Sequence, residues 1–419
     1  MTAEIGILNR QCVALAADSA VTISSNGKEK ISNSANKLFN LLKGKPIGFM
    51  VYGNGSFMGL PWEVVVNYYR ETFDDKVAYP TLESICDDFI NKISHSPIFH
   101  NQDAQSKLIV NKMEIFLEKI IKETQDTLAN RYPNMKVEES VALDVLHEIV
   151  CVYHSKFSNI EYSENFTESD KEYIYSICDS IVDSLCKHHI ELPISTDLFD
   201  MLKEVCALLM CKNILFNFSG IVIAGYGDDE FLPRLFHYKI EGIVNNKLKY
   251  NVGGTSVIEQ SEFNGGITAE IVPFAQQEMV HSILTGMDPS LQEITFNSIA
   301  KKFYNISNTI KIDDPVVKGQ LETFLSEQFN QIEAEISKYQ FDNYISPVLN
   351  MVSMLNKDEL ATMAENLVNI TSFKRKFTTD TETVGGPIDV AVISKTEGFI
   401  WIKRKHYFNR ELNHTYFNI

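Results

Sequence analysis

The chain has 419 residues, of which 44% are hydrophobic and 11% aromatic, so it can bury a large core. Its net charge of −17 disfavours a general binder of phosphate backbones. The seven cysteines contain no Cys-x-x-Cys pair. The sequence also has neither a signal-peptide pattern nor the roughly 20 consecutive apolar residues of a membrane span. We therefore expect a cytoplasmic protein with no metal, cofactor, nucleic-acid or membrane partner.

The first sixty residues predict β structure. Alternation or short apolar runs favour strands over residues 3–8, 12–17, 37–42 and 47–52, with turns at Gly27 and after Gly53. From about residue 61 to 215 the period becomes helical. Apolar residues recur at three- and four-residue spacing over 62–73, 82–93, 104–131, 137–157, 168–187 and 195–214. This block is typical of a helical hairpin that carries a large helical insertion.

β structure returns near residue 218, with strands predicted over 220–224, 235–243 and 247–252, the last ended by Gly253-Gly254. Residue 278 opens a second helical stretch that continues to about 373. Residues 388–393 and 399–402 then predict a closing hairpin. The order strands, helices, strands, helices, strands suggests packed sheets covered by helices. We expect one domain over 1–419, with core strands in about 1–60, 217–270 and 384–405, the insertion in 61–215, and a second helical layer in 275–375.

Thr2 is the first candidate for chemistry. Threonine is small enough for methionine aminopeptidase to remove Met1, which would make Thr2 the N-terminus. An α-amino group has a pKa of roughly 7.7–8.0, so part of it is neutral near pH 7. The neutral amine can accept the hydroxyl proton of the same residue as Oγ attacks a carbonyl carbon. An N-terminal Met-Thr is also common in proteins without this chemistry.

Such a nucleophile needs a nearby cation, a carboxylate that orients the cation, and an N–H group for the oxyanion. Asp18 follows an apolar strand, Lys37 lies at the head of the next strand, and Gly53 ends the strand 47–52. Each of the three also has an ordinary structural interpretation, as a cap, a solvated charge or a turn.

The order of these segments resembles the start of proteasome β-subunits and their bacterial ring-forming homologues. The matching segments are Thr-Ala-Glu-Ile-Gly-Ile, Val-Ala-Leu-Ala-Ala-Asp-Ser-Ala-Val-Thr, Lys-Leu-Phe and Gly-Phe-Met-Val-Tyr-Gly. The far end, Gly-Gly-Pro-Ile-Asp-Val-Ala-Val-Ile from Gly385, is similar to the closing hairpin of that family. Together the segments cover roughly a quarter of the chain. The resemblance implies the α+β, four-layer αββα sandwich of N-terminal-nucleophile (Ntn) hydrolases, here with an enlarged helical insertion.

The resemblance also implies roles for individual residues. Thr2 would be the nucleophile, and Asp18 and Lys37 the charge pair that activates it. Gly53 would supply an oxyanion N–H group, and the backbone of Thr22 would align an extended substrate.

The chain departs from the family in the interval between Asp18 and Lys37, which is a few residues longer than usual. The hairpin 24–33 must absorb this insertion. Lys28 and Lys30 are therefore rival lysines, although the Lys-Leu-Phe context favours Lys37.

A second departure concerns the Asp and Ser that the family places shortly before its Gly-Gly pair. Asp380 would fill the acidic role and Thr383 the hydroxyl role, with a shift of one residue. The serine that the family carries on a middle turn has no clear equivalent, and Ser261 is the nearest candidate.

The expected function is that of a threonine-type hydrolase that cleaves peptide bonds through an acyl-enzyme on Thr2. Two alternatives stay open: a small-molecule amidase of the same fold, and a non-catalytic proteasome-like subunit. The resemblance implies a peptide or unfolded-protein substrate and a homo-oligomer, for which a ring is one form, and it admits an ATPase unfoldase as a partner.

Overall fold

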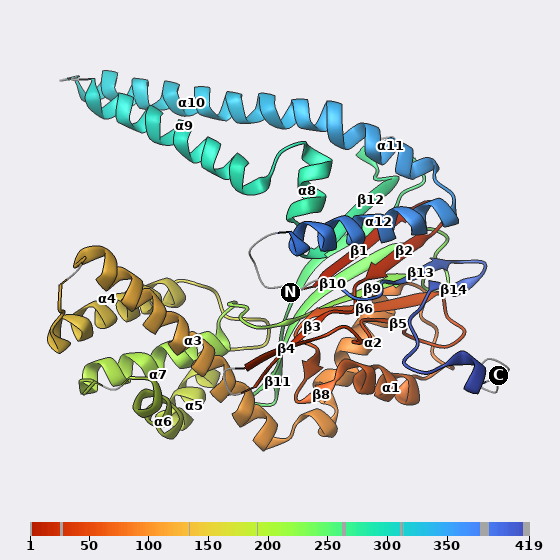
Figure 1. Cartoon of the computed structure of the whole chain (residues 1–419), viewed down its shortest axis with the longest axis horizontal. Coiled ribbons are helices and arrows are strands. Elements are labelled where there is room, and N and C mark those ends of the chain that lie inside the picture. Colours follow the sequence, from red (N-terminus) through yellow and green to blue (C-terminus); the bar gives the residue numbers. More distant parts are fainter. Residues whose placement is uncertain are drawn as a thin grey trace. The chain divides into compact units, whose positions relative to one another are not determined.

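The computed structural model describes residues 2–25, 28–133, 135–190, 192–261, 265–310, 312, 314–377 and 385–413. The protein is a mixed α+β molecule with two five-stranded antiparallel sheets (Figure 1). The chain divides into two compact units. Unit 1 comprises Met1–Tyr52, Ala224–Leu235 and Ser256–Ile419, and unit 2 comprises Gly53–Ile223 and Phe236–Thr255.

The first sheet has the order β12-β1-β2-β13-β14. Its strands are β12 (Ala269–Ala275), β1 (Ala3–Asn9), β2 (Val13–Ala17), β13 (Asp389–Ser394) and β14 (Gly398–Lys403). Every residue of β1, β2 and β13 is buried, which explains why these strands are rich in Ala, Ile and Val and do not alternate with polar residues. The sequence predicted four of these five strands.

Helix α12 (Lys357–Lys376) covers one face of the first sheet and packs on β1, β2 and β13 (Figure 1). Its buried residues recur at helical spacing: Leu360, Ala361, Ala364, Leu367 and Val368. The other helices of this block are α8 (Glu278–Thr285), α9 (Pro289–Thr309), α10 (Pro315–Gln340) and α11 (Ser346–Met354), with a π-helical turn over Phe341–Ile345. Helices α9 and α10 run side by side as a long hairpin.

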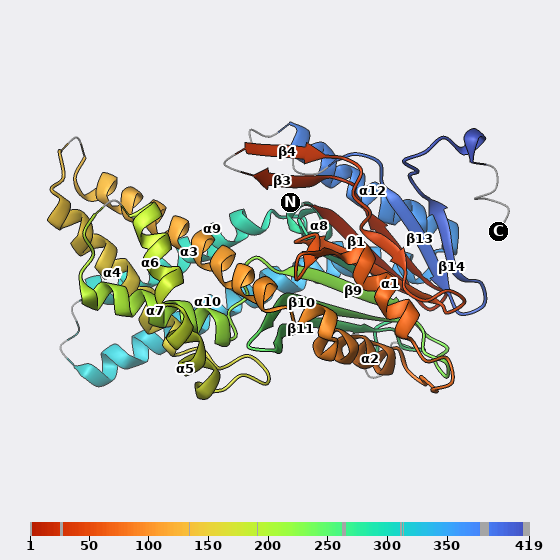
Figure 2. The same ribbon diagram turned by 90° about the horizontal axis from the view of Figure 1, so that it is seen from below.

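Strands β5 (Leu38–Asn40) and β6 (Ile47–Gly53) lie against the opposite face of the first sheet. At Gly48 of β6, an added Cβ atom would come within 2.9 Å of Leu15 and 2.8 Å of Ile393, so the missing side chain permits close packing between the sheets. β5 and β6 belong to the second sheet, whose order is β11-β10-β9-β6-β5. Strands β3 (Val21–Ser25) and β4 (Lys28–Ser32) form a separate hairpin (Figure 2).

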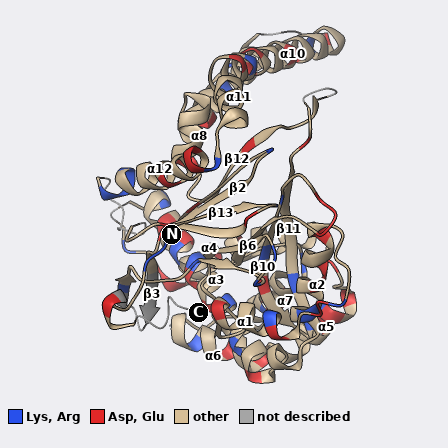
Figure 3. Cartoon of the chain, turned by 90° about the vertical axis from the view of Figure 1, so that its right-hand side faces the viewer, with Lys and Arg blue, Asp and Glu red and all other residues tan. Residues whose placement is uncertain are grey.

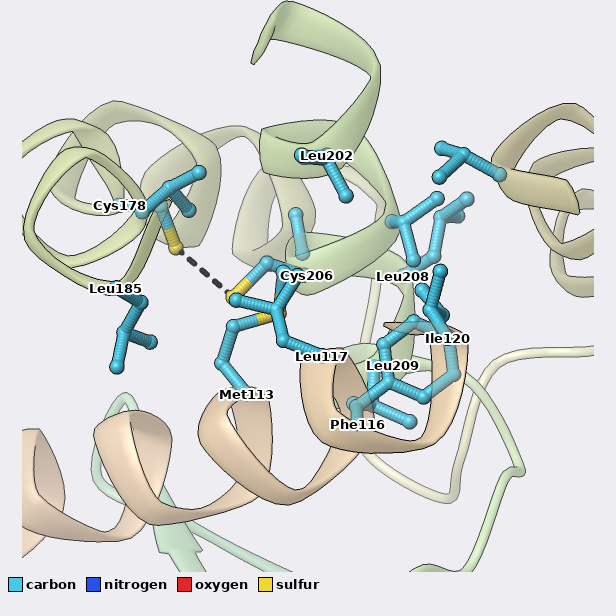
Figure 4. Close-up of a cluster of buried hydrophobic side chains, with 14 of the residues drawn as sticks. Met113, Phe116, Leu117, Ile120, Cys178, Leu185, Leu202, Cys206, Leu208 and Leu209 are labelled. Atoms are coloured by element: carbon cyan, nitrogen blue, oxygen red, sulfur yellow. Dashed lines mark hydrogen bonds between the residues drawn. The ribbon is translucent and has the colours of Figure 1, made fainter. Parts of the chain in front are cut away.

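Unit 2 is largely helical. It contains β7 (Ser56–Phe57), β8 (Leu60–Pro61), α1 (Trp62–Thr72), α2 (Leu82–His95), α3 (Gln102–Arg131), α4 (Glu139–Ser158), α5 (Glu168–Ile177), α6 (Asp179–His189) and α7 (Thr196–Cys211), with a short 3₁₀ turn at Pro97–Phe99. A second 3₁₀ turn, Arg410–Leu412, belongs to unit 1. Figure 4 shows the bundle core, where side chains of α3 and α7 such as Phe116 and Leu209 interlock. The helical periodicity predicted helices in this part of the chain, and the structure has them.

The remaining strands are β9 (Ser219–Gly225), β10 (Arg234–Val244) and β11 (Lys247–Val257). A buried ion cluster within unit 2 joins helix α3 to β10 and β11. Lys112 Nζ lies 2.5 Å from Glu241 Oε1, and Lys249 Nζ lies 2.9 Å from Glu241 Oε2. Burial lowers the pKa of Lys112 to about 8, while the adjacent Glu241 opposes that shift.

Two sequence predictions were wrong in detail. The expected helix 168–187 is two helices that meet at Cys178. The N–H of Cys178 donates hydrogen bonds to the carbonyls of both Ile174 and Tyr175. Its thiol lies 3.3 Å from the thiol of Cys206 (Figure 4). Strand β11 continues through Gly253-Gly254, because the bare Gly253 backbone leaves room for His237.

Strand β12 had no counterpart among the predicted strands. It contains Pro273, which normally argues against a strand, but β12 is at the edge of its sheet, where a residue without an N–H is tolerated.

Candidate active site

The candidate site lies where β1 begins and β2 ends. These strands are antiparallel, with Glu4 opposite Ala17, so Thr2 and Asp18 come together although 16 positions separate them in the chain. The N–H of Asp18 donates to the carbonyl of Ala3 at 3.2 Å, and the N–H of Ala3 donates to Oδ1 of Asp18 at 3.2 Å. Thr2 is only 4% exposed, and its carbonyl accepts a hydrogen bond from the N–H of Gln276 at 3.3 Å.

Asp18 is 1% exposed and accepts four hydrogen bonds. Besides the N–H of Ala3, its donors are the N–H of Ala20 at 3.3 Å, the N–H of Gly385 at 2.9 Å, and Nζ of Lys37 at 2.5 Å. A buried carboxylate with this number of donors is satisfied and held in one orientation. The predicted position of Asp18 next to Thr2 is therefore supported by the geometry.

Lys37 directly precedes β5, and the N–H of Val51 on β6 donates to its carbonyl at 2.8 Å. Its ammonium group lies between two carboxylates, 2.5 Å from Asp18 Oδ1 and 3.3 Å from Glu4 Oε1. Of the rival lysines, Lys30 on β4 is exposed, and the side chain of Lys28 is outside the described atoms. The geometry therefore pairs Asp18 with Lys37, as the Lys-Leu-Phe context predicted.

Glu4 is the residue that sequence reasoning missed. It is two positions after Thr2, which directly precedes β1, and the two side chains lie near each other; Glu4 is 1% exposed. Burial raises the pKa of the Glu4 carboxyl to about 8, while Lys37 and the nearby Thr2 hydroxyl act in the opposite direction. A charged residue within an otherwise apolar, buried strand was the signal that could have identified it.

The Thr2 hydroxyl lies near the Glu4 carboxyl but makes no hydrogen bond of regular geometry within the described part of the chain. Among the described residues, Thr2 Oγ1 makes no hydrogen bond of regular geometry, and the same holds for both carboxyl oxygens of Glu4. A buried hydroxyl without a partner normally costs about 1–3 kcal/mol, and such groups concentrate at functional sites. Thr2 Oγ1 is thus buried, makes no regular hydrogen bond to a described residue, and lies near the ion pair of Asp18 and Lys37.

The closing hairpin is fastened to the site by Ser19. Its N–H donates to the carbonyl of Gly385 at 3.2 Å, and its hydroxyl donates to the carbonyl of Pro387 at 2.5 Å. Gly386 has φ +78° and lies against Asn33, where an added Cβ atom would come within 2.9 Å of a carbon atom. These contacts place the N–H of Gly385 on Asp18, which explains why the two similar segments at opposite ends of the chain belong to one site.

The remaining predicted site residues make no contact with Thr2, Asp18 or Lys37 that the described atoms show, or lie outside the described residues. Gly53, the last residue of β6, belongs to unit 2. Its φ of +74°, and an added Cβ atom 2.6 Å from the carbonyl oxygen of Phe218, both require glycine. Thr22 pairs with Ile31 in the β3–β4 hairpin, and Ser261 is exposed. Asp380 and Thr383 lie outside the described residues, so their supporting roles stay predictions.

Within the described ranges, no group of three or more His, Cys, Asp or Glu side chains is arranged to hold a metal ion. None of the helices there combines the length and apolar character that crossing a bilayer requires. No family model matches the chain, and no curated protein matches it significantly.

Proposed function

We propose that this protein is a threonine-type N-terminal-nucleophile hydrolase that cleaves peptide bonds through Thr2. The observation that carries the proposal is the buried hydroxyl of Thr2, which makes no hydrogen bond of regular geometry among the described residues and lies in the cluster of Glu4, Lys37 and Asp18. With Met1 removed, the α-amine of Thr2 accepts the Oγ proton while Oγ attacks the carbonyl carbon of the substrate. The scissile C–N bond then breaks, the leaving amine takes the proton, and an ester to Thr2 is left for water to hydrolyse.

The Asp18–Lys37 pair supports this chemistry electrostatically. Lys37 places a positive charge in a buried site, where it favours both the neutral α-amine and the negative charge that develops on Oγ. Asp18 holds that ammonium at 2.5 Å and is itself held by backbone N–H groups of Ala3, Ala20 and Gly385. The charge is therefore in place before substrate arrives, and little reorganisation is needed during the reaction.

We further propose that the fold is the four-layer αββα sandwich of this class. In unit 1, helix α12 packs on the first sheet and β5 packs on its other face. In unit 2, the phenol of Tyr238 on β10 contacts the thiol of Cys86 on α2, so that helix lies on strands of the second sheet. This sequence of contacts, helix on sheet, sheet on sheet and sheet on helix, supports the assignment.

The same proposal includes a peptide or unfolded-protein substrate and a homo-oligomeric assembly. A ring is one form of that assembly, and an ATPase unfoldase is a partner that such a ring could have. A nucleic-acid substrate is disfavoured, since the net charge is −17 and Figure 3 shows positions of Lys and Arg interspersed with positions of Asp and Glu along the helices. The cytoplasmic location that we expect belongs to this proposal as well.

Intact-mass spectrometry of the purified protein, combined with hydrolysis of fluorogenic peptide amides, tests the proposal. We expect a mass without Met1, activity in the wild type, and no activity in Thr2→Ala of normal fold. Retention of Met1, or equal activity in Thr2→Ala, would contradict the mechanism. Activity on small amides alone, from a protein that light scattering shows to be monomeric, would favour an amidase. A processed protein without activity on either substrate class would favour a non-catalytic subunit.

A further inference from the structure

Glu4 has no task in the mechanism above, yet it is buried at its centre. Both of its carboxyl oxygens are enclosed without a regular hydrogen bond among the described residues, and it is 1% exposed. Its charged form is supported by the ion pair with Lys37 at 3.3 Å and, more weakly, by the nearby Thr2 hydroxyl. An ionised carboxylate in such a place carries a desolvation cost that one longer ion pair does not offset.

The groups around Glu4 give the site a different net charge when Glu4 is ionised and when it is protonated. Lys37 and Asp18 face it from the segments before β5 and after β2, and Thr2 faces it from the residue before β1. The phenol of Tyr52 on β6 lies close enough to interact with its charge. When Glu4 is ionised, two carboxylates share one ammonium group, and the cluster is negative next to the Thr2 hydroxyl. When Glu4 is protonated, Lys37 and Asp18 neutralise each other.

The two carboxylates are also supported unequally. Asp18 accepts three backbone N–H bonds in addition to the Lys37 ammonium, whereas Glu4 accepts none of regular geometry. A shared proton therefore belongs on Glu4, because protonating Asp18 would weaken four charge-assisted bonds. Burial acts in the same direction and raises the pKa of Glu4 to about 8.

We propose that Glu4 is a positioning residue of the Thr2 site that holds a proton at neutral pH and so keeps the Lys37 charge directed at Asp18 and Thr2. The inference rests on the proposed function for its catalytic consequence. Loss of the Glu4 proton draws Lys37 toward Glu4 and places a negative charge beside Oγ, which opposes the negative charge that develops there. Ionisation of Glu4 thus switches the site off at alkaline pH.

The test compares wild type, Glu4→Gln and Glu270→Gln over pH 6 to 10 with the peptide amides. Gln has the shape of a protonated Glu and cannot ionise. Glu270 is a matched control, because it is a partly buried carboxyl in β12 of the same sheet whose pKa burial also raises. We expect kcat/KM of wild type and Glu270→Gln to rise as the α-amine deprotonates and then to fall tenfold per pH unit. Glu4→Gln should match wild type within about twofold at pH 6.5 and lack the fall.

Two outcomes overturn the inference. If Glu4→Gln folds but is inactive at every pH, Glu4 is an obligatory base rather than a proton-holding group. If its pH profile has the same alkaline fall as wild type, Glu4 does not gate the site. The conservative Glu4→Asp keeps an ionisable group and should retain the alkaline fall, which a purely structural role of the side chain would not predict.

A readout without catalysis separates this inference from the proposed function. Infrared difference spectra of wild type between pH 6 and 10 should show loss of a protonated-carboxyl band that Glu270→Gln retains and Glu4→Gln lacks. Absence of that band in wild type overturns the inference even if the protein is a hydrolase. Presence of the band in a protein that hydrolyses nothing leaves the protonation of Glu4 established and rejects the proposed function alone.

Discussion

Replacing Glu4 by Gln should remove a pH-dependent cost from the stability of the fold. Burial raises the pKa of this carboxyl to about 8 in the folded protein, from its ordinary value of 4.5. Because the folded pKa is the higher one, the folded state binds more protons than the unfolded state between these values. Wild type therefore loses stability as pH rises through that window, at up to about 1.4 kcal/mol per pH unit.

Over the whole window, from 4.5 to about 8, the loss sums to roughly 5 kcal/mol as an upper value. Glu4→Gln cannot ionise and should show none of this contribution. The difference in free energy of unfolding between Glu4→Gln and wild type should thus be constant below pH 4.5, grow in favour of the variant up to about pH 8, and then level off.

Urea unfolding at pH 5, 7 and 9, followed by tryptophan fluorescence and by circular dichroism, measures this difference. Glu270→Gln is the control: the pKa of Glu270 is also raised by burial, but without an adjacent Asp18 or Lys37. A difference between Glu4→Gln and wild type that does not change from pH 5 to pH 9 would refute the reasoning, because Glu4 would then titrate alike in both states.

The remaining predictions concern the charges of the two units. Asp18→Asn should keep the fold but lower kcat/KM by roughly 10²–10³, the usual cost of a misdirected electrostatic group, as measured on peptide amides. Lys37→Ala should lose a similar factor while Lys30→Ala keeps wild-type activity; the opposite pattern would transfer the catalytic role to the exposed lysine. Glu241→Ala leaves Lys112 and Lys249 buried without their partner and should cost about 3–5 kcal/mol in urea unfolding of unit 2. Glu148→Ala, which removes an exposed pair with Arg131, should leave the urea midpoint nearly unchanged.

The parts of the fold that could be predicted are those with a local cause. Strands β1, β2 and β6 and the closing hairpin follow from short apolar runs bounded by turns, and the helices of unit 2 follow from their period. Strand β12 could not be recognised in the same way. Its Pro273 is tolerated because the strand has an edge position, which only the assembled sheet provides.

The same distinction between local and long-range causes applies to the residues of the candidate site. Asp18 and Lys37 could be proposed because each follows or precedes a strand with a recognisable sequence. The N–H of Gly385 on Asp18 joins residues 367 positions apart, and no local pattern encodes that contact. Glu4 was missed because its importance comes from its burial next to Lys37, which is 33 positions away in the chain and reaches Glu4 only in the folded protein.

The site therefore contains two carboxyl groups, Asp18 and Glu4. The sequence does not show how they differ, but their surroundings in the folded protein do. Asp18 is fixed as an acceptor by three backbone N–H groups and one ammonium, and Glu4 has a longer contact with that ammonium and the nearby Thr2 hydroxyl, with no backbone donor among the described residues. In a buried cluster with one lysine, neutrality requires that one of the two acids holds a proton, and the hydrogen bonds decide which. Removing the charge of Asp18 should therefore disable the site at every pH, whereas removing that of Glu4 should spare it at neutral pH and extend its activity into the alkaline range.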